Sequence, residues 1–304
     1  MTRGKPRPGG KAASGELFAP AVKRGDAPIE PGVDLARAAE QRIRVGVGGW
    51  TFAPWRDNFY PAGLPQRREL EYASRQLSAI EINGTYYGAQ KPAIYAKWRD
   101  ETPEGFVFSA KAPKRIMQSR SLTSVQSQIE DFIGGIAELG DRLGPLVWQF
   151  EKGRRVALEE LDAFLSALPA RHGKRDLRHA VELRDHALVD ADLIALLKKH
   201  RIAAVFTDSE EHPSFADITG DFVYARLMRS QPGVVTGYAP PDIARWAECV
   251  RRWAGGDDPA ELPHIDPAQA TAKPRDIFVY FISAAKERNP AAAMALIREL
   301  AKGG

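Results

Sequence analysis

The sequence predicts a single α/β domain of the (β/α)₈ barrel type, preceded by a disordered basic tail. Three observations predict it: eight short β-rich runs in series, a stretch of helical period after nearly every run, and polar residues toward the ends of the runs. The chain has 304 residues, 44% hydrophobic and 27% charged, and one barrel of about 250 residues fits this length without a second domain.

The predicted strands are short segments rich in β-branched and aromatic residues. They cover residues 43–49, 79–83, 105–112, 145–150, 178–184, 202–208, 221–227 and 276–283. Eight strands favour a closed barrel over an open doubly wound sheet, which more often has about five to seven. No Gly-rich dinucleotide or phosphate-loop motif follows any of them, and we therefore expect no cofactor.

Several helices between these strands carry start and stop signals. Asp190 precedes one apolar stripe as a predicted N-cap, and Gly255 with Gly256 ends another. Two further helices are expected to open at Pro241–Asp242 and at Asn289–Pro290. Residues 212–220 are too few for a full helix, and residues 257–275 are expected to form an extra loop before the last strand.

The basic charge lies in the first part of the chain. Residues 1–24 contain six Lys or Arg against Glu16 alone, which is +5, so the remaining chain carries about −1 of the net +4. We expect residues 1–42 to form the tail and residues 43–304 the barrel. A neutral body does not favour a nucleic-acid-binding domain, although weak contact between the tail and polyanions is an alternative.

The sequence also predicts a cytoplasmic protein with no membrane partner. The apolar runs reach about six to eight residues, far below the roughly 20 that a membrane span needs. The basic N-terminus lacks the apolar segment of a secretory signal. The single cysteine, Cys249, lies in a helical pattern with Trp246 and Val250 and is expected to be a small buried hydrophobe.

Polar residues recur on one face of the predicted strands. Side chains of a strand alternate between its two faces, so Ile80 and Ile82 should contact helices while Glu81 and Asn83 point into the barrel. The same alternation directs five further polar side chains inward: Lys111, Gln149, Glu182, Arg184 and Arg226. All lie toward the carboxyl ends of their strands, where barrel enzymes carry their sites.

Two interpretations of this polar ring remain open. In one, Glu81 and Glu182 neutralise the cations and form a plug without chemistry. In the other, cations and amides bind a small anionic or polyhydroxylated ligand, and a carboxylate acts as base. Trp50 and Tyr86, in loops beside this face, could stack on such a ligand, although aromatic loop residues often simply pack the loop.

The ligand-site interpretation suggests a hydrolase or a lyase. Glu81 or Glu182 would be the general base, and Lys111, Arg184 and Arg226 would hold the anion. A variant of this hypothesis uses Lys111 as a Schiff-base nucleophile. The expected catalytic residues are Glu81, Lys111 and Glu182, and the expected ligand-binding residues are Trp50, Asn83, Tyr86, Gln149, Arg184 and Arg226.

A metal-dependent barrel acting on phosphodiesters or nucleic acid is an alternative that the histidines do not favour. They are expected in loops, at helix ends or at the wrong end of a strand: His172, His179, His186, His200, His212 and His264. We therefore expect no metal site.

Several motifs together resemble the DUF72 (YecE-like) family. They are VGVGGWTFAPWRDNFYPAGLP (45–65), EINGTYYG (81–88), WRDETPEGFVFSAKAPKRI (98–116), LGDRLGPLVWQF (139–150) and VELRD (181–185). The resemblance extends over nearly all of residues 43–300 and implies a TIM-type barrel. Polar residues typical of the family match Glu81, Asn83, Lys111, Gln149, Glu182, Arg184 and Arg226, but the resemblance supplies no substrate.

The sequence departs from this family pattern at two strand ends. Met228 stands where the family usually has a histidine, and Ile282 and Ser283 replace two asparagines. If those groups take part in chemistry, this chain is altered or inactive. A catalytically inactive binding or scaffold barrel is therefore a further hypothesis, and whether the protein is an enzyme stays open.

Overall fold

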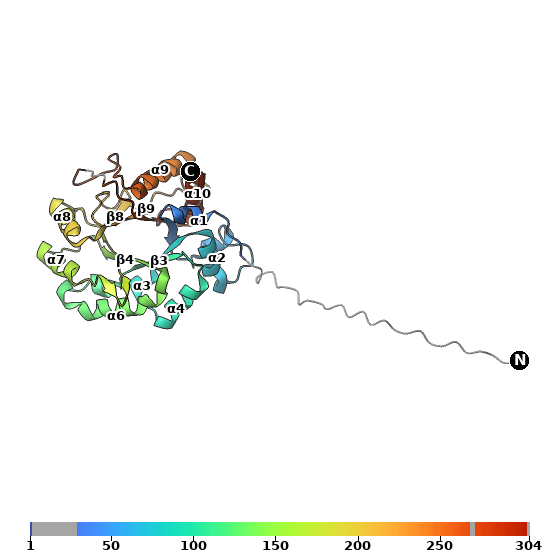
Figure 1. Ribbon diagram of the computed structural model, residues 1–304, viewed down its shortest axis with the longest axis horizontal. Helices are drawn as coiled ribbons and strands as arrows, with labels where there is room; N and C mark the ends of the chain where they lie inside the picture. Colours follow the sequence, from blue (N-terminus) through green and yellow to red (C-terminus); the bar gives the residue numbers. More distant parts are fainter. Residues whose placement is uncertain (2–28, 268–270, 303–304) are drawn as a thin grey trace.

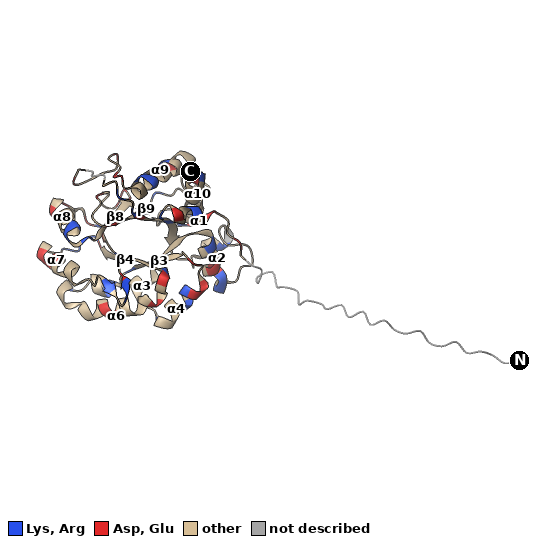
Figure 2. Ribbon diagram, viewed as in Figure 1, with Lys and Arg blue, Asp and Glu red and all other residues tan. Residues whose placement is uncertain are grey.

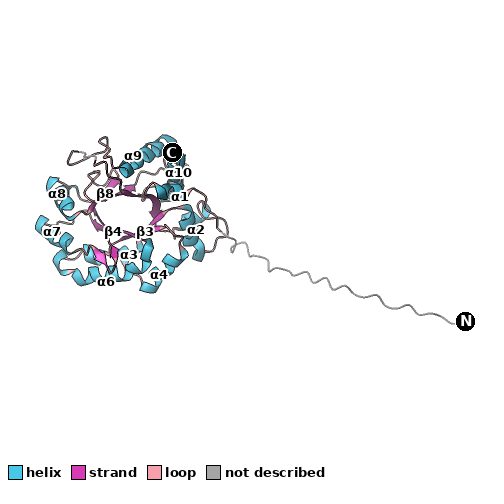
Figure 3. Cartoon of the chain, viewed as in Figure 1, coloured by secondary structure: helices cyan, strands magenta, loops and turns pink. Residues whose placement is uncertain are grey.

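The computed structural model describes Met1, residues 29–267 and residues 271–302. Eight parallel strands close into a barrel in which each strand pairs with the next one along the chain, and the last pairs with the first. The strands form an inner ring and the helices lie around it (Figure 1; Figure 3). The predicted (β/α)₈ barrel is confirmed.

The strands agree closely with the predicted segments. Each falls within its predicted range, except that β4 begins at Leu143 instead of residue 145. The barrel strands are β1 (Ile43–Gly48), β2 (Ala79–Ile82), β3 (Val107–Lys111), β4 (Leu143–Phe150), β7 (His179–Leu183), β8 (Ala203–Asp208), β9 (Phe222–Leu227) and β10 (Asp276–Phe281). A separate antiparallel pair consists of β5 (Arg171–His172) and β6 (Arg175–Asp176).

Helices follow every barrel strand except β8. As predicted, the described residues 209–221 between β8 and β9 form no helix. The helices are α1 (Leu35–Glu40), α2 (Glu69–Gln76), α3 (Gly84–Tyr87), α4 (Pro92–Glu101), α5 (Lys114–Met117), α6 (Gln126–Ile136), α7 (Leu158–Ala167), α8 (Ala191–His200), α9 (Pro240–Gly255) and α10 (Asn289–Lys302).

The predicted helix boundaries have the expected local causes. The Asp190 carboxylate caps α8 by accepting a hydrogen bond from the backbone N–H of Leu193 at 2.9 Å. Gly256 ends α9 with a φ of 99°, and a Cβ at this position would lie 2.4 Å from the backbone nitrogen of Lys273. A glycine is required there because both the left-handed conformation and the space exclude a side chain.

The folded body begins before residue 43. Residues 2–28 of the expected tail lie outside the described residues, but residues 29–42 belong to the folded body. Asp34 caps α1, and Ala38 of that helix is buried. The Gln76 amide accepts from Gly32 N–H and donates to the Glu30 carbonyl, each at 2.8 Å. These contacts correct the expected boundary at residue 42.

Two hydrophobic cores confirm the predicted alternation of side chains. The outer core, between barrel and helices, contains Ile80 and Ile82. The inner core fills the barrel and includes the rings of Tyr224 and Tyr280, whose centroids are 5.0 Å apart at 30°. Cys249 is buried in the outer core as expected, and burial raises the pKa of its thiol to about 12.

Charges of both signs are distributed over the helices around the barrel (Figure 2). Within the described part of the chain, the helices are too short or too polar to cross a membrane.

Candidate ligand site at the barrel mouth

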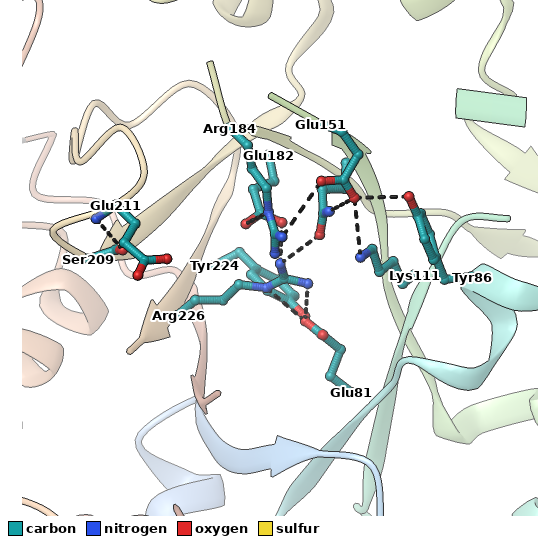
Figure 4. Close-up of polar contacts among 11 residues, drawn as sticks. Glu81, Tyr86, Lys111, Glu151, Glu182, Arg184, Ser209, Glu211, Tyr224 and Arg226 are labelled. Atoms are coloured by element: carbon teal, nitrogen blue, oxygen red, sulfur yellow. Dashed lines mark hydrogen bonds and ion pairs between the residues drawn. The ribbon is translucent and has the colours of Figure 1, made fainter. Parts of the chain in front are cut away.

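Arg226 of β9 lies at the centre of a buried ion network at the carboxyl ends of the strands (Figure 4). Its guanidinium donates to Glu81 Oε2 from Nε at 3.0 Å and from Nη2 at 2.7 Å. Its Nη1 donates to Gln149 Oε1 at 3.2 Å and forms an ion pair with Glu182. Arg226 is 1% exposed, so strands β2, β4, β7 and β9 share one solvent-shielded network.

The alternation of side chains explains how three other strands reach one guanidinium of β9. The strand register places Gln149 beside Glu182, and Tyr224, two residues before Arg226, faces the same way. The Tyr224 hydroxyl donates to Glu81 Oε2 at 2.5 Å. Glu81 Oε1 is buried and has no hydrogen-bond partner among the described residues.

The charges in this network hold one another ionised. Burial alone lowers the pKa of Arg226, but Glu182 and Glu81 raise it more, and the net pKa is above its ordinary value. Burial alone raises the pKa of Glu182, whereas Arg226, Arg184 and Lys111 lower it more, and the net pKa is below its ordinary value. Glu182 is therefore a carboxylate at neutral pH.

Glu151, immediately after β4, organises a second layer nearer to solvent. Its Oε1 accepts hydrogen bonds from the Tyr86 hydroxyl at 2.9 Å and from the Gln149 amide. Arg184 connects the two layers, because its Nη1 lies 3.7 Å from Glu151 Oε2 and its Nε donates to Glu182 Oε1 at 3.2 Å.

The charge of Lys111, at the end of β3, is neutralised less closely than that of Arg226. Its side chain is 10% exposed, and its Nζ lies 3.9 Å from the centre of the Tyr86 ring and 4.0 Å from Glu151 Oε1. This Nζ makes no hydrogen bond to any described residue. Burial, and then Arg226, lowers the pKa of Lys111 to about 8, while burial raises that of Tyr86 to about 12.

A cavity of about 320 Å³ opens above this network. Four of its lining residues are cations: Lys111, Arg184, Arg226 and Lys286. The other described residues of the lining are Gly48, Asn83, Tyr86, Tyr87, Ile282, Ser283 and Asn289, so no carboxylate is among them.

A larger hollow of about 560 Å³ lies at the opposite end of the barrel, and its lining includes two carboxylates, Asp141 and Asp176. There, Arg175 lies 2.5 Å from Asp141 and Arg178 lies 2.5 Å from Asp276. The cavity at the mouth is therefore the better candidate for an anion site.

The nine predicted site residues fall into three groups. Five line the cavity: Asn83, Tyr86, Lys111, Arg184 and Arg226. Glu81, Gln149 and Glu182 lie beneath it in the Arg226 network. Trp50 was expected to contact the ligand, and this expectation is corrected because Trp50 does not line the cavity. Its ring packs edge-on against the ring of Trp98 outside the barrel, with the ring centres 4.9 Å apart.

Sequence reasoning missed four residues of this region. Glu151 and Tyr224 follow the same inward alternation as Gln149 and Arg226 and could have been found by extending it by two residues. Lys286 lies in the loop after β10 and carries no pattern signal. His212 lies in the loop after β8, where its Nδ1 is buried without a partner among the described residues; burial and Arg184 lower its pKa.

The strand ends that depart from the family pattern take different positions. Ile282 and Ser283 line the cavity, and Met228 does not. Ser283 and Ala284 have φ values of 60° and 47°, a left-handed conformation that is unfavourable for residues other than glycine. Strained backbone of this kind concentrates at functional sites.

Across residues 29–267 and 271–302, no group of three or more His, Cys, Asp or Glu side chains is arranged to hold a metal ion.

These features define a (β/α)₈ barrel with a cationic cavity at the carboxyl ends of its strands. A family model described as "Protein of unknown function DUF72" matches residues 44–304, and the chain belongs to that family. The resemblance read from the motifs is thereby confirmed.

The chain is similar to curated members over part of its length. It is 27% identical to the UPF0759 protein YecE of Escherichia coli over 144 residues, which are 47% of this chain and 48% of YecE. It is 31% identical to the UPF0759 protein YunF of Bacillus subtilis over 70 residues, 23% of this chain and 24% of YunF. The aligned region thus spans about half of YecE.

Solved structures of the family share the fold. A DUF72 family protein of Thermotoga maritima aligns with a TM-score of 0.63 at 18% identity, over 86% of this chain and 98% of that one. One from Enterococcus faecalis aligns with a TM-score of 0.59 at 15% identity, over 86% and 94%.

Proposed function

We propose that the barrel mouth binds a small anionic ligand of the sugar-phosphate type and that the protein acts on it as a lyase or hydrolase. The observation that carries the proposal is the cavity lining, which contains four cations and, among the described residues, no carboxylate. A phosphate or carboxylate group would bind beside these cations, and the carboxylates that pair with them, Glu81, Glu151 and Glu182, lie outside the lining. The volume of about 320 Å³ suits a small metabolite.

The contacts revise the expected roles of the two glutamates. Glu182 is held by Arg226 and Arg184, and Glu81 by Arg226 and Tyr224, so both support the floor of the cavity. In the proposed site, proton transfer belongs to Glu151, whose side chain is 33% exposed and lies beside Lys111 and Tyr86. Arg184, Arg226 and Lys286 hold the anion, with Asn83 and Tyr86 as further contacts.

Two other hypotheses make different predictions. A scaffold barrel would bind the same anion without converting it to a product. A nucleic-acid-processing barrel would bind oligonucleotides in preference to small phosphates. A cytoplasmic location stays a prediction, which cell fractionation would test.

The test is a thermal-shift screen of sugar phosphates, nucleotides and short oligonucleotides, with the unphosphorylated sugars as matched ligands. We expect phosphorylated small molecules to raise the melting temperature and the free sugars to have little effect. Lys286→Met should weaken the binding roughly tenfold, about 1.4 kcal/mol, because it removes one cavity cation.

Lys97→Met is the matched control, since Lys97 is an exposed residue of α4 that pairs with Glu101 and does not line the cavity. Equal binding by the two lysine variants, or no shift with any small anion, would contradict the proposal. A shift with oligonucleotides alone would favour the nucleic-acid hypothesis.

A further inference from the structure

Lys111 differs from the two arginines of the mouth in what surrounds its charged group; Lys286 also lies over an aromatic ring, with its Nζ 4.5 Å from the centre of the Phe52 ring. Arg226 and Arg184 are each bound to carboxylates by hydrogen bonds. The Lys111 amine lies over the Tyr86 ring and makes no hydrogen bond to a described residue, although its side chain is nine-tenths buried. Its ion pair with Glu151 is long, at 4.0 Å, so its charge is weakly compensated, and the group lines the ligand cavity.

We propose that Lys111 forms an imine with the carbonyl group of an anionic ligand held by Arg184, Arg226 and Lys286. The ligand class is a small aldehyde or ketone that carries a phosphate or carboxylate group. This inference rests on the proposed function, because the same cavity cations bind the anionic end of the ligand.

The amine is suited to attack a carbonyl carbon at moderate pH. With a pKa of about 8, about 10% of Lys111 is neutral at pH 7, compared with about 0.03% of a lysine with an ordinary pKa of about 10.5. Only the neutral amine is nucleophilic. Burial, the main cause of the low pKa, also keeps the group from water.

Glu151 is placed to move the protons that this reaction requires. Its Oε1 lies 4.0 Å from Lys111 Nζ and accepts a hydrogen bond from Tyr86. Glu151 first takes the proton that the Lys111 ammonium loses. The neutral amine nitrogen then forms a bond to the carbonyl carbon, and Glu151 gives this proton to the carbonyl oxygen, which becomes a hydroxyl. Glu151 next takes a second proton from the nitrogen and gives it to the hydroxyl, which leaves as water while the iminium forms.

The reaction is balanced without an oxidant or a reductant. A lysine ammonium and a carbonyl give an iminium ion and one water, and the water contains the carbonyl oxygen and two of the ammonium protons. The resulting iminium retains the positive charge of Lys111 beside Glu151 and Tyr86.

The test uses three matched ligands and sodium cyanoborohydride, which reduces an imine to a stable amine. Glycolaldehyde phosphate has both groups, glycolaldehyde lacks the anion, and hydroxyethyl phosphate lacks the carbonyl. With glycolaldehyde phosphate we expect one reduced adduct per chain, located on Lys111 by peptide mass mapping. Hydroxyethyl phosphate should compete with it, and glycolaldehyde should react much more slowly at this residue.

Lys111→Arg distinguishes the imine from anion binding. This variant retains a cation in the cavity, so hydroxyethyl phosphate should still raise its melting temperature while the adduct is lost. Glu151→Gln tests the proton transfer: the rate of trapping should fall roughly 10²-fold, whereas the thermal shift should remain. A purely structural role of Glu151 would lower both together.

Each outcome decides between the two proposals. Adducts spread over surface lysines and absent from Lys111, together with a normal thermal shift, would overturn the imine and leave anion binding intact. Absence of both the adduct and the shift would overturn both proposals. An adduct that persists at the same rate in Glu151→Gln would overturn the role of Glu151.

Discussion

Lys111 and Arg226 reach the same barrel mouth from different strands, but their charges are compensated to different degrees. Arg226 contacts Glu81 and Glu182 directly, and its pKa is raised. Lys111 is almost as well buried, yet its closest carboxylate oxygen lies 4.0 Å away, and its pKa is lowered. Arg226 is thus held in its charged form by the two carboxylates, whereas Lys111 loses its proton more readily than an ordinary lysine.

We expect Lys111→Met to stabilise the fold at neutral pH. The folded-state pKa of Lys111, about 8, is below the unfolded value of about 10.5, so the unfolded chain binds more protons between these values. The lysine therefore destabilises the fold below about pH 8, and this penalty disappears as the pH rises toward 10.5. The expected gain at pH 7 is roughly 1 to 3 kcal/mol.

Urea denaturation of the wild type and Lys111→Met at pH 7 and near pH 10 measures this difference. It should shrink at the higher pH. A constant difference, or destabilisation at pH 7, would show that the amine is stabilised in a way that the contacts do not account for. Lys97→Met, at a largely exposed lysine of α4, is the control for the removal of a surface cation.

Alternation along the strands was enough to predict which residues point to the mouth. It placed Glu81, Lys111 and Arg226 correctly, because one strand direction fixes the side on which every second residue lies. Neutralisation of the cations by Glu81 and Glu182 was one of the two interpretations, but alternation could not show that Arg226 contacts both glutamates, since that depends on how the strands are arranged in space. Lys286 was missed because loop residues follow no fixed period.

At the scale of elements, alanine substitutions at two glycines, one inside a helix and one at a helix end, test the local structure. Gly134 lies inside α6, and a Cβ there would meet nothing within 4 Å. Gly134→Ala should therefore stabilise the protein by about 0.5 to 1 kcal/mol. Gly256→Ala should destabilise it by about 2 to 4 kcal/mol, because of its positive φ and the approach of the Lys273 backbone.

Thermal or urea denaturation of the two alanine variants checks both signs in one experiment. Destabilisation by Gly134→Ala would show that the exposed face of α6 is covered, and a neutral Gly256→Ala would refute the left-handed end of α9.

The sequence predicted all eight barrel strands but missed the β5–β6 pair and helix α1. The strands have strong β-rich runs bounded by turn residues, which local patterns reveal. Helix α1 has six residues and follows a Pro- and Gly-rich stretch. Such a composition is typical of disordered segments, so this short helix was not predicted. Its order depends on contacts far along the chain, such as those between Gln76 and residues 30–32.

At the scale of the whole molecule, closure of the barrel depends on close approach between β1 and β2. A Cβ on Gly46 would lie 1.9 Å from the backbone oxygen of Ala79, its partner in the strand register. Gly46→Ala should therefore force the strands apart and destabilise the fold by about 3 kcal/mol or more. Gly48→Ala is the control, because its nearest contact is the movable side-chain nitrogen of Asn83 at 2.7 Å.

Urea denaturation and near-ultraviolet circular dichroism compare the two variants. The Gly48 variant should retain the native spectrum and lose less than about 1.5 kcal/mol. Similar stability in both would contradict the tight contact between β1 and β2.

The Arg226 network and the tyrosines beneath it make the cavity a well with a closed bottom. Arg226 is nearly inaccessible to solvent, and the stacked rings of Tyr224 and Tyr280 fill the barrel below. A molecule that descends to Arg226 has to return through the mouth by which it came. If two reactants share this well, the deeper one has to bind first and depart last, so the order of binding and release is set by the shape of the barrel.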